Sequence, residues 1–223
     1  MDSALYLLFA ILYAALFAYG MTVWAKDSAR GFRYLLLLVT AALLWDNGVL
    51  GAGRWIGEGD WLERLNRTRY WLHAFVTPLL AVVSLDLMRR AGSPWARKPA
   101  AMGAAWLFAA ALIVLEVATV TWSVKLKPVY EYGALRYASA GTSPEIPFMV
   151  VLVMIPLLAA GAVLWKRRVT SALFWGTIVM GAGSAIRLPV RSSAVANLFE
   201  LVLIGALWLS VASLRNRRPA KAS

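Results

Sequence analysis

The ionisable side chains inside the apolar segments of this chain are few and, apart from Asp86 near the end of one segment, they are expected to lie at one depth. The set comprises three acids, one histidine and one arginine: Asp46, Glu116, Glu200, His73 and Arg187. A charged group in hydrocarbon is costly unless it has a partner, so such residues are candidates for function by default. Groups of these types can bind a polar ligand, transfer protons or form buried ion pairs. The residue types alone leave these alternatives open.

Hydrogen-bonding residues accompany these groups at helical spacing. Tyr70, His73 and Thr77 stand at i, i+3 and i+7, which places them on one face of a helix. Asn197 lies three residues before Glu200 and shares its face. We therefore predict one ligand-binding set in the outer half of the protein: Asp46, Asn47, Tyr70, His73, Thr77, Glu116, Arg187, Asn197 and Glu200.

Seven apolar segments must position these residues. The chain has 223 residues, of which 61% are hydrophobic, and a mean hydropathy of +0.67. A soluble domain is roughly 45–50% apolar, and a helix needs about 20 apolar residues to cross a bilayer. We predict an all-α integral membrane protein, a seven-transmembrane-helix bundle that forms a single domain over residues 1–223. Its helices are expected at about 3–24, 33–53, 70–88, 100–121, 146–165, 170–187 and 194–214.

The basic residues predict the orientation of the bundle. Lys and Arg concentrate in alternate connections, at residues 26–33, 89–98, 166–168 and 215–221. Cytoplasmic loops carry such an excess, so the N-terminus is expected outside and the C-terminus inside. The expected location is a bacterial inner (plasma) membrane. The formal net charge of +12 is explained mainly by this topology. We therefore expect no nucleic-acid partner, whereas membrane lipids are expected partners and oligomerisation is left open.

Composition also limits the chemistry. The chain has no cysteine and one histidine, which excludes disulfides, thiolate chemistry and a multi-histidine metal site built by this chain alone. We predict no metal and no cofactor. Two outer connections, residues 54–69 and 122–145, are long, and the second is expected to form a short hairpin or lid over the outer mouth. Pro78 and Pro156 are expected to kink their helices.

The third apolar segment carries a local resemblance to a known family. Its pattern Arg69-Tyr70, six residues, then Thr77-Pro78-Leu79-Leu80 resembles the third helix of microbial rhodopsins, as does the predicted topology. In that family an acidic counterion follows the arginine by three residues, and here Leu72 stands there. The retinal-bearing lysine lies four residues after a carboxylate on the last helix, where this chain has Glu200 and then Ile204. The resemblance thus implies a rhodopsin-like scaffold with no lysine placed for covalent retinal.

Three functions remain open at this point. The first is a pocket protein that binds, senses or carries a small polar or lipid-like ligand, with Arg187 and His73 holding its polar group. The second is an intramembrane enzyme doing acid–base chemistry on a lipid or isoprenoid, with His73, Asp46 and Glu116 as candidate catalytic groups. The third is an accessory membrane subunit, in which the buried acids form a structural network.

Overall fold

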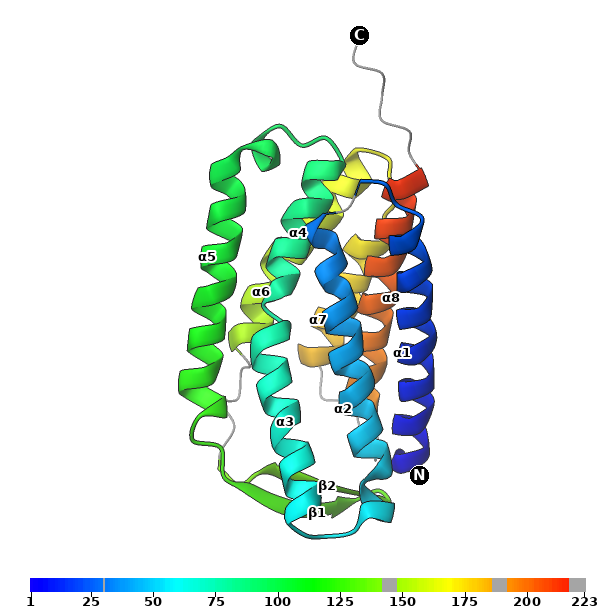
Figure 1. The fold of residues 1–223 in the computed structure, drawn as a ribbon, viewed down its shortest axis with the longest axis vertical. Coiled ribbons are helices and arrows are strands. Elements are labelled where there is room, and N and C mark those ends of the chain that lie inside the picture. Colours follow the sequence, from blue (N-terminus) through cyan, green and yellow to red (C-terminus); the bar gives the residue numbers. More distant parts are fainter. Residues whose placement is uncertain (30, 142–147, 186–191, 217–223) are drawn as a thin grey trace.

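The computed structural model describes residues 1–29, 31–141, 148–185 and 192–216. Long helices run alternately up and down along one axis, and the first helix begins at the end of the bundle opposite to the one where the last helix ends (Figure 1). The helices are α1 (Asp2–Ala25), α2 (Leu36–Ile56), α3 (Asp60–Val76), α4 (Leu79–Arg90), α5 (Pro99–Glu116), α6 (Phe148–Lys166), α7 (Ala172–Ala185) and α8 (Val195–Asn216).

The protein is mostly helical and has the helices of an integral membrane protein. In the described part of the chain, six helical segments are long and apolar enough to cross a bilayer: Asp2–Ala25, Phe32–Ile56, Asp60–Arg90, Pro99–Thr121, Phe148–Lys166 and Val195–Asn216. The remaining predicted span, 170–187, corresponds to α7, which has 14 described residues and is shorter. Each predicted apolar segment thus contains helix.

The connection predicted at residues 54–69 is shorter than expected. Residues 54–69 were expected to connect two spans, but α2 continues to Ile56 and α3 begins at Asp60. Asp60 and Glu63 lie in the first turn of α3, where acidic side chains stabilise the positive end of the helix dipole. The third span therefore covers Asp60–Arg90 and begins ten residues before the predicted start at residue 70.

Pro78 interrupts this third span. Helix α3 ends at Val76 and α4 begins at Leu79, because proline has no N–H to continue the hydrogen-bond ladder. Pro156, in contrast, lies inside α6, which the structure assigns as one helix from Phe148 to Lys166. The break at Pro78 follows directly after Thr77, so it lies beside the predicted polar face of α3.

Small residues let the helices approach closely. A Cβ on Gly51 would stand 2.7 Å from a Leu7 side-chain carbon of α1, and one on Gly176 would stand 2.7 Å from the Ala206 Cβ of α8. Membrane bundles commonly use small residues at such crossings. Gly48 meets nothing within 4 Å, so its hydrogen side chain is not required by packing.

A β-hairpin lies across the end of the bundle that carries the N-terminus (Figure 1). Strand β1 (Leu126–Glu131) pairs antiparallel with β2 (Ala134–Ser139), which confirms the hairpin expected within 122–145. Tyr132 and Gly133 have positive φ angles of 51° and 82°, as a tight hairpin turn requires. The Met1 amino group donates to the Tyr132 carbonyl at 2.8 Å. The hairpin is thereby fixed to α1.

The opposite end of the bundle contains a buried ion-pair network. Arg33 is 3% exposed and donates to Asp27 at 2.6 Å and to Asp86 at 3.0 Å. Tyr34 donates to Asp27 at 2.7 Å. Burial alone would raise the pKa of Asp27, but hydrogen bonds from Tyr34, Arg33 and the Ala29 N–H outweigh it and lower this pKa to about 2. Asp27 follows α1 and Asp86 lies on α4, so Arg33 joins the connection after α1 to α4 at this end of the bundle.

Candidate functional site

A polar cavity lies between the helices near the end that carries the hairpin. Its volume is about 260 Å³, and six predicted site residues line it: Asp46, Tyr70, His73, Glu116, Asn197 and Glu200. They come from α2, α3, α5 and α8, so residues far apart in the sequence meet at one depth. The helix faces predicted from spacing are therefore those that turn toward a common space.

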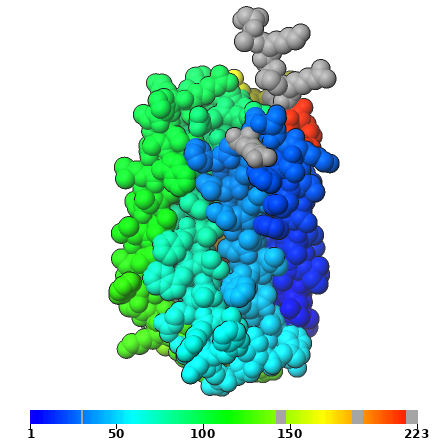
Figure 2. All heavy atoms as spheres, viewed as in Figure 1, coloured from blue at the N-terminus to red at the C-terminus, as the bar shows by residue number. Residues whose placement is uncertain are grey.

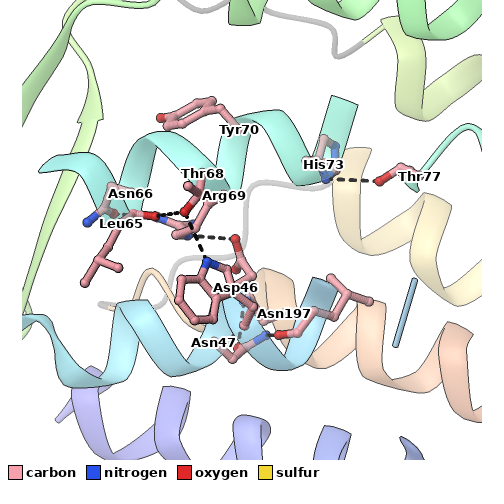
Figure 3. A network of polar contacts seen from close by, with 12 residues as sticks. Asp46, Asn47, Leu65, Asn66, Thr68, Arg69, Tyr70, His73, Thr77 and Asn197 are labelled. Carbon is pink, nitrogen blue, oxygen red and sulfur yellow. Dashed lines mark hydrogen bonds and ion pairs between the residues drawn. The ribbon is translucent and has the colours of Figure 1, made fainter. Parts of the chain in front are cut away.

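An ion pair forms one wall of this polar cavity. The Arg69 Nε donates to Asp46 Oδ1 at 2.7 Å, and its Nη1 donates to Asn66 Oδ1 at 2.8 Å (Figure 3). The Arg69 and Asp46 side chains are 16% and 23% exposed. Arg69 was not among the predicted site residues, yet it lines the cavity together with His73, four residues later on the same helix face. That i, i+4 spacing was the signal available for finding it.

Asn47 has a different place from the one predicted. It is fully buried and does not line the polar cavity, because its Nδ2 donates to the Leu43 carbonyl at 2.9 Å. Its Oδ1 accepts a hydrogen bond from Asn197 Nδ2 at 2.9 Å (Figure 3). Asn47 therefore joins α2 to α8 and holds Asn197 at the cavity wall. Thr77 lines a neighbouring chamber and not the polar cavity, and Arg187 lies outside the described residues.

His73 lines the polar cavity and two neighbouring cavities. Next to it, a mainly apolar chamber of about 70 Å³ is lined by aliphatic side chains together with Asp46, Arg69, His73, Thr77 and Glu200. To its side, a lateral cavity of about 700 Å³ is lined by His73, Glu116 and Val120, with residues of α6 and of the hairpin. Thr77 Oγ1 lies 3.2 Å from His73 Nδ1. The imidazole thus stands where a polar space meets two more apolar ones.

The acids of the polar cavity differ in their partners. Asp46 is held by Arg69, whereas no ion pair or hydrogen bond joins the Glu116 or Glu200 carboxyl group to another residue in the described ranges. The same ranges contain no group of three or more His, Asp and Glu side chains placed to hold a metal ion. The arrangement offers a ligand two free carboxyl groups, an imidazole and an amide.

The Glu116 position follows from an irregular helix end. Helix α5 ends at Glu116 and continues as a π-helical turn over Val117–Thr121, in which the Trp122 N–H donates to the Val117 carbonyl at 2.9 Å. Single π turns are frequent at functional sites because they re-aim the side chains around them. Here the turn lets both Glu116 and Val120 face the polar and the lateral cavity.

Comparison with protein-family models found no match, and comparison with curated proteins found none either.

Proposed function

We propose that the protein is a polytopic membrane protein that binds an amphipathic, lipid-like ligand in the polar cavity and thereby senses or carries it. One observation supports the proposal most strongly: the polar cavity adjoins an apolar chamber and a large lateral cavity, with shared lining residues. A ligand that fills such a space must have a compact polar head joined to an apolar chain. Pockets between bundle helices commonly bind ligands in this way.

The lateral cavity provides a route from the lipid. Helix α5 lies at one edge of the bundle (Figure 1), and only Ala109 and Leu112 are buried along its length. The side chains of α5 form one flank of the face in Figure 2, beside those of α3. Because Val120 and Glu116 line both the lateral and the polar cavity, an apolar chain can extend from the polar head toward the bilayer between α5 and α6.

The proposal includes a rhodopsin-like, seven-helix topology with the N-terminus outside and the C-terminus inside a bacterial inner membrane. The basic connections that predict it lie at the end of the bundle opposite the hairpin, so the cavity would open in the outer leaflet. The absence of native cysteine permits a direct test. A membrane-impermeant maleimide applied to intact cells should label Glu58→Cys and spare Ser28→Cys, and the reverse pattern would refute the orientation.

Blocking the junction between the cavities tests the binding function. Val120→Trp fills the space shared by the polar and lateral cavities, while Val114→Trp, on the same segment and 67% exposed, serves as the matched control. Native mass spectrometry of the purified protein, mixed with twelve-carbon amphiphiles of differing heads, should show bound amphiphile for the wild type and Val114→Trp only. Equal binding to all three proteins would refute the proposal.

A specific observation also keeps an enzymatic role under test. His73 lines all three cavities, so it would lie beside the polar head and the first carbons of any amphipathic ligand. General acid–base chemistry needs an imidazole within hydrogen-bond reach of the reacting group. Incubation with extracted membrane lipids should then yield a product that the His73→Gln variant does not form. Formation of the same product by both proteins would exclude His73 as the catalytic group.

A further inference from the structure

We propose that the polar head of the ligand carries an ammonium group, bound by the carboxylates of Glu200 and Glu116. This inference rests on the proposed function and names the ligand class for the same cavity. The site holds an amphiphile with a positively charged nitrogen at one end and an apolar chain at the other.

The charge balance of the cavity wall points to a cationic head. The described lining carries three acids and one arginine, and that arginine is already engaged with Asp46 at 2.7 Å. Glu200 and Glu116 remain without an ion pair or hydrogen bond in the described ranges. His73 and Tyr70 are the other titratable residues in the described lining, and neither supplies a fixed positive charge.

A ligand cation would complete this wall. Taking a carboxylate out of water is unfavourable unless an opposite charge or hydrogen-bond donors replace the water. Both glutamates are partly buried, each on a helical segment that is long and apolar enough to cross a bilayer. An ammonium group supplies a charge and up to three N–H donors in one small head, which fits a cavity of about 260 Å³.

The cation near the mouth does not oppose this assignment. Lys125 lines the lateral cavity, but its side chain is exposed at the hairpin end, where water and salt screen its charge. Glu116 is less exposed and lines both the lateral and the polar cavity. A head that moves inward thus passes from a screened lysine to two less exposed carboxylates.

Three amphiphiles with the same twelve-carbon chain test the head group. Dodecylamine, dodecanol and dodecanoate are titrated at pH 7 into the full-length protein in zwitterionic lipid nanodiscs, and the thermal midpoint is followed at each concentration. We expect dodecylamine, which is protonated at this pH, to raise the midpoint at concentrations at least about tenfold lower than the other two, equivalent to about 1.4 kcal/mol.

Isosteric variants locate the contact. Glu200→Gln and Glu116→Gln should each require about tenfold more dodecylamine for the same shift, whereas Glu131→Gln, on the exposed hairpin, should behave as the wild type. The midpoint without ligand checks that each variant is folded. Unchanged dodecylamine dependence in both cavity variants would overturn the ammonium assignment.

The outcomes separate this inference from the proposed function. If all three amphiphiles stabilise the wild type equally and Val120→Trp abolishes the effect, the cavity binds amphiphiles but the ammonium assignment is wrong. If no amphiphile stabilises the wild type more than Val120→Trp, both the assignment and the proposed function are refuted.

Discussion

Replacing Glu200 by glutamine should make the ligand-free protein more stable, although Glu200 lines the cavity. Its carboxylate is partly buried without an ion pair in the described ranges, so no attraction offsets its desolvation free energy in the ligand-free protein. An unsatisfied buried polar group costs about 1–3 kcal/mol, and partial exposure places Glu200→Gln at the low end, about 1 kcal/mol of stabilisation. A residue that lowers the stability of the folded protein is typical of a functional site.

Replacing the neighbouring Arg69 should change the free energy of unfolding in the opposite direction. Arg69→Gln leaves Asp46 without its partner at 2.7 Å and also removes the hydrogen bond to Asn66. The side chains of Arg69 and Asp46 are 16% and 23% exposed, between a surface pair and a buried one. We therefore expect a loss of about 2–3 kcal/mol, between about 0–1 kcal/mol for exposed pairs and about 3–5 kcal/mol for buried ones.

A matched control lies two residues away on the same helix. Arg67 pairs with Glu63 at 2.7 Å, but these side chains are 45% and 33% exposed, so Arg67→Gln should change stability by less than about 0.5 kcal/mol. The assay is thermal unfolding followed by circular dichroism, with protein stripped of lipid in a non-ionic detergent. If Glu200→Gln lowers the midpoint as much as Arg69→Gln does, the acids form a structural network and the reasoning about a ligand cavity is wrong.

Three other predictions concern the ends of the bundle. Arg33→Gln should cost about 3–5 kcal/mol in unfolding free energy, because it strands two buried acids; a loss below about 1 kcal/mol would contradict the buried network. The pKa of Asp27 is about 2 in the folded protein and 3.8 in the unfolded chain, so ionised Asp27 stabilises the fold above pH about 4. This contribution should be lost as the pH falls from 3.8 to about 2. Asp27→Asn should flatten the stability profile in that range, and an unchanged slope would show that Asp27 is not responsible. Gly53→Ala should detach the hairpin, because its Cβ would overlap the Leu135 carbonyl oxygen, whereas Gly48→Ala meets open space; faster proteolysis of residues 126–139 in Gly53→Ala alone is expected.

The sequence predicted the helices and most of the cavity wall for a simple physical reason. Crossing hydrocarbon requires long apolar helices, so their positions are evident from composition, and helical spacing fixes which side chains share a face. Tyr70 and His73 on α3 and Asn197 and Glu200 on α8 were paired in this way, and all four line the polar cavity.

The rest depended on contacts between segments that are distant in the sequence. Nothing local shows that Asp46 pairs with Arg69 or that Asn47 turns to Asn197, because these contacts are set by how α2 packs against α3 and α8. The Arg33 network was not predicted for the same reason, since Asp27 lies in a connection that folds onto Arg33. Loop residues carry no periodic signal from which such a contact could be predicted.

The most direct test of the account is to see where an amphiphile lies. An experimental structure with a dodecylamine analogue brominated near its nitrogen should show bromine density between Glu116 and Glu200, with the chain leaving between α5 and α6. Bromine density confined to the lipid-facing surface, with side chains alone filling the polar cavity, would contradict the central claim.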